Sequence, residues 1–278
     1  MTCMRSSTSL AFLMLALMPT GGCARFWTMQ TSGDVLRHQT VRGQLVFHSD
    51  EPLPKSHRLL DELIEQRSEL LSMLDLQPSD EPIYVYLFAS PERYKEYIHA
   101  HYPELPDRRA FFVERDTRLE VFAHWGDRVA EDLRHEVAHG YLHSVAPRIP
   151  LWLDEGLAEN FEVPRGYKNL NWPHVAHLAE RLNAGWRPNL ERLEALTSPR
   201  EMDQIDYAES WAWIHFMLRT FPERQDILRR HVRDIRDRGT AEPLSSQLRR
   251  ISGDPNQVLA DYIRHLAAAR GSALAARR

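Results

Sequence analysis

Hydrophobic residues recur at two different spacings between residues 42 and 125, and these spacings predict both helices and strands. Apolar residues at helical spacing predict a helix over 59–76; they are Leu60, Leu63, Leu70, Leu71 and Leu74. Short apolar runs, rich in aromatic and β-branched residues, predict strands at 44–48, 82–88, 110–113 and 119–123. Ser90 and Pro91 have the residue types of a helix start, so a short helix is expected after the second strand.

From Asp127 onward the pattern is almost entirely helical. The predicted helices span 128–145, 150–162, 174–184, 188–197, 206–219, 223–238 and 255–269. Strands that come first and helices that follow favour an α+β fold over a doubly wound parallel sheet. We therefore expect a small N-terminal lobe at 42–162, in which a mixed β-sheet is combined with helices, and a mainly helical C-terminal lobe at 163–278.

The charge balance argues against one class of partner. The chain has 278 residues with 35 Lys and Arg against 39 Asp and Glu, and the two signs are mixed along it. A formal net charge of -4 gives no electrostatic argument for binding a phosphate backbone, so no nucleic-acid partner is expected.

The first 22 residues are predicted to be an export signal. Arg5 supplies a positive charge, residues 10–18 form an apolar run too short to span a bilayer, and Gly21 and Gly22 precede Cys23. This arrangement resembles the lipobox of bacterial lipoproteins, with Thr20 where a Leu is usual. The resemblance implies a lipoprotein signal peptide over 1–22, lipidation of Cys23, a tether over 23–41 and an extracytoplasmic protein anchored to a bacterial membrane. A plain signal peptide cut near the same place is the alternative.

The cysteine count limits the metal chemistry open to the mature chain. Cys3 and Cys23 are the only cysteines; the first would leave with the signal and the second would carry lipid. No thiol is then left for a disulfide or a metal ion, so a metal site has to come from histidine and carboxylate side chains.

Residues 135–139 read His-Glu-Val-Ala-His, which is the H-E-x-x-H pattern of zinc metallopeptidases. Residues four apart share one face of a helix, so His135 and His139 can bind the same small cation. Glu136 lies one step round the helix, where its carboxylate can reach a water molecule without binding the ion. Two solvated histidines on an exposed helix are the alternative.

Zinc in a catalytic site needs a third protein ligand. His143 lies two turns from His135, about 12 Å along the axis, which is too far for both to bind one ion. The metzincin pattern fails because Leu142 and Val145 stand where Gly and His belong. The next predicted helix carries four acids within nine residues and no Lys or Arg, as a metal-binding face would, although a solvated acidic face is the alternative.

The two segments together resemble a known group. His-Glu-Val-Ala-His followed by Trp-Leu-Asp-Glu-Gly-Leu-Ala-Glu at 152–159 is similar to the gluzincins, and most of all to bacterial peptidase-MA-like domains. The resemblance is specific over 132–162 and weaker over 203–219. It implies a thermolysin-like fold with the active site between the lobes, Glu155 as the third ligand of Zn²⁺, and a spacing from His139 shorter than in thermolysin.

Three further expectations concern residues around the metal. A metal-bound histidine usually donates its second ring N–H to a carboxylate, and Glu159 is the candidate partner of His135; a surface glutamate is the alternative. Tyr207 resembles the family's downstream tyrosine that stabilises the oxyanion, although a packing role is equally typical of a tyrosine there. The strand at 119–123 is expected to pair with an extended peptide.

These observations lead to one main functional hypothesis and two alternatives. The main hypothesis is a membrane-tethered zinc metallopeptidase that hydrolyses a peptide or protein substrate, with Glu136 as general base. The first alternative is a lipoprotein that binds zinc and a partner without turnover. The second is a helical scaffold without metal.

Overall fold

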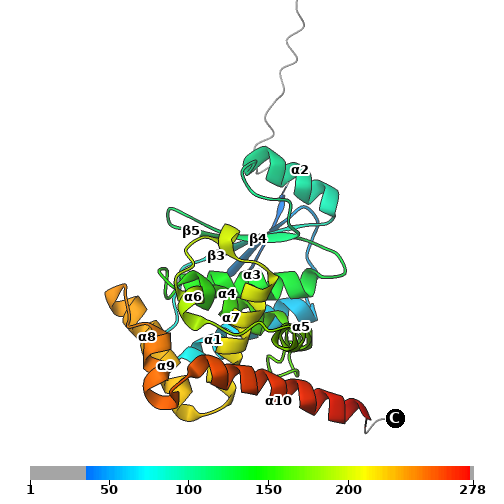
Figure 1. Cartoon of the computed structure of the whole chain (residues 1–278). Helices are drawn as coiled ribbons and strands as arrows, with labels where there is room; N and C mark the ends of the chain where they lie inside the picture. The colour runs from blue at the N-terminus through cyan, green and yellow to red at the C-terminus, as the bar shows by residue number, and fades with distance from the viewer. Residues whose placement is uncertain (1–35, 276–278) are drawn as a thin grey trace, which may run out of the picture.

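The structure is a computed structural model that describes residues 36–275 (Figure 1). The predicted signal peptide, Cys23 and most of the predicted tether lie outside the described residues. The strands are β1 (His38–Arg42), β2 (Leu45–Ser49), β3 (Ile83–Phe88), β4 (Ala110–Arg115) and β5 (Arg118–His124). The helices are α1 (Arg58–Leu74), α2 (Pro91–His101), α3 (Val129–His143), α4 (Leu151–Glu162), α5 (Trp172–Asn183), α6 (Leu190–Glu194), α7 (Gln204–Arg219), α8 (Pro222–Arg238), α9 (Leu244–Ser252) and α10 (Pro255–Ala275). In the described chain, no helix combines the length and hydropathy that crossing a bilayer requires.

The five strands form one mixed sheet in the order β1-β2-β3-β5-β4. The three central strands are parallel, with Leu45 opposite Ile83 and Ile83 opposite Leu119, while β1 and β4 pair antiparallel at the two edges. The prediction that the tether extends to residue 41 is wrong for its last residues, because β1 begins at His38. The α+β class with a small mixed sheet followed mostly by helices is confirmed.

Helices cover both faces of the sheet (Figure 1). On one face, α2 packs through Tyr94, Tyr97 and Ile98 against an aromatic cluster that includes Phe88 and Phe122. On the other face lie α3 and α1, and their apolar side chains belong to a second core that continues through α4 and α7 as far as α10. The lobe boundary predicted at residue 162 stays a prediction; this second core contains residues from both sides of it.

Helix α4 lies at the centre of that core. Every residue from Trp152 to Phe161 is buried, so the helix contacts other parts of the chain on all sides. It packs against α3 on one side and α7 on the other. At the α7 crossing a Cβ on Gly156 would lie 2.6 Å from the carbonyl oxygen of Ser210, which means that only glycine allows this close approach. Core packing therefore fixes the backbone of α4, from which its acidic side chains extend.

Candidate metal centre

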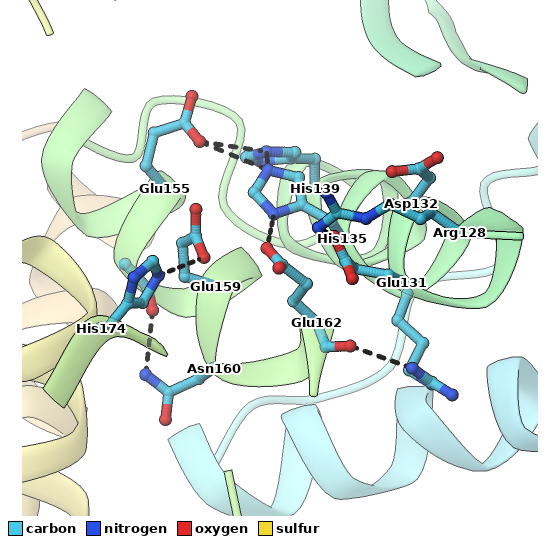
Figure 2. Close-up of polar contacts among 12 residues, drawn as sticks. Arg128, Glu131, Asp132, His135, His139, Glu155, Glu159, Asn160, Glu162 and His174 are labelled. Carbon is cyan, nitrogen blue, oxygen red and sulfur yellow. Dashed lines mark hydrogen bonds and ion pairs between the residues drawn. The ribbon is translucent and has the colours of Figure 1, made fainter. Parts of the chain in front are cut away.

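The H-E-x-x-H segment lies in α3 and the acidic segment forms α4, with residues 144–150 joining the two helices. Three side-chain atoms converge where they face each other (Figure 2). The Nε2 atoms of His135 and His139 are 3.1 Å apart, and Oε2 of Glu155 lies 3.5 Å from the first and 3.6 Å from the second. The structure thus brings together the three residues that the sequence predicts as ligands.

These separations can be compared with those around a zinc ion. Ligand atoms about 2.0–2.1 Å from a tetrahedral zinc ion lie about 3.3–3.4 Å from one another. The observed 3.1, 3.5 and 3.6 Å bracket that value. The two distances to Glu155 exceed those of good N–H···O hydrogen bonds, so hydrogen bonding alone is a poor account of the cluster. Two imidazoles and one carboxylate are also the donor set of a catalytic zinc site with an open position, and the residues fit the ion.

The other ring nitrogen of each histidine faces a different carboxylate of α4. Nδ1 of His139 lies 2.9 Å from Oδ1 of Asp154, and Nδ1 of His135 lies 3.5 Å from Oε2 of Glu162 (Figure 2 shows the second pair). A carboxylate at Nδ1 holds the proton on that nitrogen and directs the Nε2 lone pair toward a metal. Both imidazoles are therefore oriented with Nε2 toward Glu155.

The Asp154 carboxylate also contacts a third histidine. Its Oδ2 lies 3.1 Å from Nε2 of His143, whose Nδ1 is 2.6 Å from Glu114 on β4. The His143–Asp154 and His143–Glu114 distances are both those of ordinary hydrogen bonds. Hydrogen bonds thus account for the position of His143 in the His139–His143–Asp154 group, whereas His139 and Asp154 form an ion pair without hydrogen-bond geometry.

The electrostatics of the cluster favour an ionised Glu155. Burial opposes its charge, but the His135 and His139 side chains outweigh burial and lower the pKa of Glu155 to about 2. Burial also disfavours a charged His139, yet the Asp154 and Glu155 carboxylates raise its pKa to about 10. A cation that binds the two imidazoles must displace their protons, so its affinity rises with pH.

Glu136 lies beside the convergent atoms without joining them. It lines, together with His135, a cavity of about 500 Å³ that opens between α3 and the segment before β4. Burial raises the pKa of the Glu136 carboxyl, and the two neighbouring imidazoles only partly oppose this effect. A carboxyl with a raised pKa is better matched to accepting and returning a proton near neutral pH.

Tyr207 belongs to the first turn of α7, and the charge of Glu155 acts on its hydroxyl. This hydroxyl is buried beside the guanidinium of Arg108, which can only donate a hydrogen bond to it, and among the described residues no acceptor takes the hydroxyl proton. Burial and the nearby Glu155 charge both raise the pKa of the Tyr207 hydroxyl, so it keeps its proton and can act as a donor. The Tyr207 hydroxyl is therefore a buried donor without an acceptor, close enough to Glu155 to be affected by its charge.

Glu159 is not hydrogen-bonded to His135, the histidine that it was expected to hold. Its Oε2 lies 2.8 Å from Nε2 of His174 on α5, and the carboxylate nearest to Nδ1 of His135 is that of Glu162 (Figure 2). The expectation of a Glu159–His135 hydrogen bond is wrong because Glu162, one turn further along the same face of α4, lies closer to the imidazole. Sequence reasoning also missed Asp154, whose position directly before Glu155 was the available signal.

The prediction that the strand at 119–123 pairs with a peptide is also wrong. Strand β5 is hydrogen-bonded to β3 on one side and to β4 on the other, so neither of its edges is free. Strand β4 is the edge of the sheet next to α3, and the Phe112 ring lies 5.8 Å from the His139 ring and 4.9 Å from the His143 ring. The free edge beside the metal cluster thus belongs to β4.

Replacing Asp154 with Asn should weaken zinc binding while leaving the fold intact. The amide keeps the shape of the side chain but loses the charge that holds the His139 proton, and losses of this kind cost about 10–100-fold in metal affinity. Competition with a chelator of known affinity would measure the change. Glu180→Gln, on an exposed position of α5, is the control and should bind zinc like the wild type. Equal affinities of wild type and Asp154→Asn would contradict the role given to Asp154.

Comparisons with known proteins give little beyond this geometry. No family model and no curated protein sequence matches the chain. Among solved structures, the chain is similar to the crystal structure of an M1 zinc metallopeptidase from Deinococcus radiodurans, with 17% sequence identity and a TM-score of 0.40. The match covers 79% of this chain and 47% of that one, so the chain spans about half the length of its neighbour. At this TM-score the likeness supports neither a fold family nor a function.

Proposed function

We propose that the protein is a zinc-dependent metallopeptidase of the gluzincin kind, with Zn²⁺ held by His135, His139 and Glu155. One observation supports this above all: two imidazole nitrogens and a carboxylate oxygen converge at the separations of tetrahedral zinc ligands, with Glu136 next to them. A site with only a structural role would have no use for a half-buried carboxylate beside it.

The side chains then divide the chemistry of peptide hydrolysis. A bound zinc ion supplies Lewis-acid polarisation of the scissile carbonyl and makes water more acidic. Glu136 accepts a proton from the attacking water and returns it to the leaving amine. Tyr207 donates a hydrogen bond from its hydroxyl, which has no acceptor among the described residues, to the carbonyl oxygen as negative charge develops there.

The free edge of β4 is proposed to bind the substrate backbone. An extended peptide can add to an exposed sheet edge through main-chain hydrogen bonds. Because β4 runs beside α3, a peptide aligned along it would pass the metal cluster. Folded proteins rarely offer such a segment, so unstructured peptides and flexible loops are the proposed substrates.

The location of the protein is part of the same proposal. The resemblance of residues 19–23 to a lipobox supports lipidation of Cys23 and a position outside the cytoplasm, on a bacterial membrane. Mass spectrometry of the membrane fraction would detect a diacylglycerol-modified Cys23. Recovery of the chain with an unmodified, cleaved N-terminus would favour the plain signal peptide.

The direct test is zinc stoichiometry followed by peptide cleavage. Wild-type protein should contain one zinc ion per chain and cleave members of an unstructured peptide library, whereas Glu155→Ala should lose both. The carboxylate is one of only three protein ligands, so its removal leaves too few for a catalytic site. Glu180→Ala is the matched control and should keep metal and activity. Zinc binding without hydrolysis would instead favour a non-catalytic lipoprotein that binds a partner, and the absence of zinc would overturn the proposal.

A further inference from the structure

The cavity beside Glu136 has an unusually charged wall. Besides His135 and Glu136, its lining includes three cations; they are Lys95, Arg108 and Arg109. It also includes four acids outside the H-E-x-x-H segment; they are Asp107, Glu131, Asp132 and Glu162. With this many acids close by, each cation on the wall would be expected to form an ion pair.

Two of the three cations do so. Nζ of Lys95 lies 3.2 Å from Asp107, and Arg109 donates two hydrogen bonds to Asp132 through Nε and Nη2, the closer at 2.7 Å. Among the described residues, no carboxylate lies within ion-pair distance of Arg108. The wall therefore presents one exposed guanidinium that has no carboxylate partner among the described residues and whose hydrogen-bond neighbour is the neutral hydroxyl of Tyr207.

Arg108 lies near Glu136 and Tyr207, the two side chains proposed to take part in the reaction. Its charge acts on the carboxyl of Glu136 and also on the hydroxyl of Tyr207, which belong to α3 and α7 respectively. Arg108 is part of the segment between α2 and β4, directly before the free-edge strand. Arg108 thus shares a cavity wall with Glu136 and hydrogen-bonds to Tyr207, the two side chains proposed to act on the scissile bond.

The residues that line the cavity indicate which part of a substrate it would bind. Glu136 lines the cavity, whereas Glu155 and Tyr207 do not. In the proposed reaction Glu136 returns its proton to the leaving amine, so the amine must lie next to it. The cavity beside Glu136 would then accommodate the residues on the C-terminal side of the scissile bond.

We propose that Arg108 binds a substrate carboxylate on the leaving-group side of the scissile bond, so that the enzyme prefers peptides with a negative charge there. This inference rests on the proposed function. Arginine suits the role because its planar fork pairs with a carboxylate through two hydrogen bonds. The carboxylate is either the C-terminus of the peptide, which makes the enzyme a carboxypeptidase, or the side chain of an acidic residue.

Binding to the zinc-loaded Glu136→Gln protein tests the proposal without substrate turnover. The probes are three N-acetylated peptides: Ala-Ala-Leu as the free acid, Ala-Ala-Leu amide, and Ala-Ala-Glu amide. Isothermal titration should show the free acid, the Glu amide or both binding about 10–100-fold more tightly than Ala-Ala-Leu amide, because hydrogen bonds between charged groups are worth that much. The tighter of the two acidic probes identifies the source of the carboxylate.

Variants at Arg108 and Lys95 would test whether the preference for acidic probes depends on Arg108. Arg108→Ala in the same background should remove the difference between acidic and neutral probes, and Arg108→Lys should keep part of it. Lys95→Ala, which removes a paired cation from the same wall, should leave the preference unchanged. A preference that survives Arg108→Ala, or no preference at all, including no binding of any probe at millimolar concentration, overturns the inference. Failure of the proposed function has a different signature, since wild-type protein would then cleave no peptide whatever probe it binds.

Discussion

Replacing Glu136 with Gln is expected to leave zinc in place and to slow peptide hydrolysis by about 10²–10⁴-fold, the usual contribution of a positioned general base. Glutamine has nearly the same shape, so the cavity wall and the two neighbouring imidazoles should keep their positions. It cannot accept a proton from water, and the leaving amine then receives none. The effect should appear in kcat more than in KM, because the lost interaction belongs to the transition state.

The measurement needs zinc analysis and single-turnover cleavage on the same preparations. Glu131→Gln is the matched control, because Glu131 lies on the same helix and cavity wall but pairs with Arg128. The control should retain most of the wild-type rate. If Glu136→Gln cleaved as fast as wild type with zinc bound, the mechanism given to Glu136 would be wrong.

Gly156→Ala should destabilise the fold by about 1–3 kcal/mol, as overpacking of a core usually does. The added Cβ would lie 2.6 Å from the carbonyl oxygen of Ser210 and 2.8 Å from Cγ1 of Ile214, so α4 and α7 would have to separate. The carbonyl is part of a helix backbone and cannot rotate away. Since Glu155 precedes this residue, separation should also disturb the metal cluster and lower zinc affinity.

Urea denaturation and chelator competition would measure the two effects. Gly271→Ala in α10 is the control, because nothing lies within 4 Å of the Cβ it would add. In a helix interior that exchange normally stabilises by about 0.5–1 kcal/mol. The control therefore separates the general benefit of alanine from the clash at the helix crossing. Equal stability changes in the two variants would contradict the close approach of α4 and α7.

The local part of the metal site was predictable from the sequence. A spacing of four residues fixes His135 and His139 on one helical face whatever the rest of the chain does. The carboxylates that contact the two imidazoles were harder to predict, because they depend on how α4 is rotated against α3. That rotation is determined by packing against α7, where Gly156 lies, and so Asp154 and Glu162 occupy positions that the one-dimensional spacing left open.

The errors in the fold have similar causes. Strand β1 at the sheet edge buries none of its residues fully, so it lacks the apolar alternation of a half-buried strand. Helix α9 has only two turns with Leu244, Ser245 and Leu248 buried, too short a pattern to stand out, and it was not predicted. The order of the strands depends on long-range pairing, which is why the free edge was assigned to β5 instead of β4.

The complete burial of α4 also affects which ions the protein would accept. In a zinc finger the metal supplies the folding energy, and the ligands move to suit the ion. Here Glu155 extends from a helix whose apolar residues are packed in the core and whose other acids contact histidines, and His139 is buried with it. Such a rigid frame cannot expand for a larger ion such as calcium, whose oxygen ligands lie about 2.3–2.6 Å away. Selectivity by size would then come from the hydrophobic core, through residues that never touch the metal.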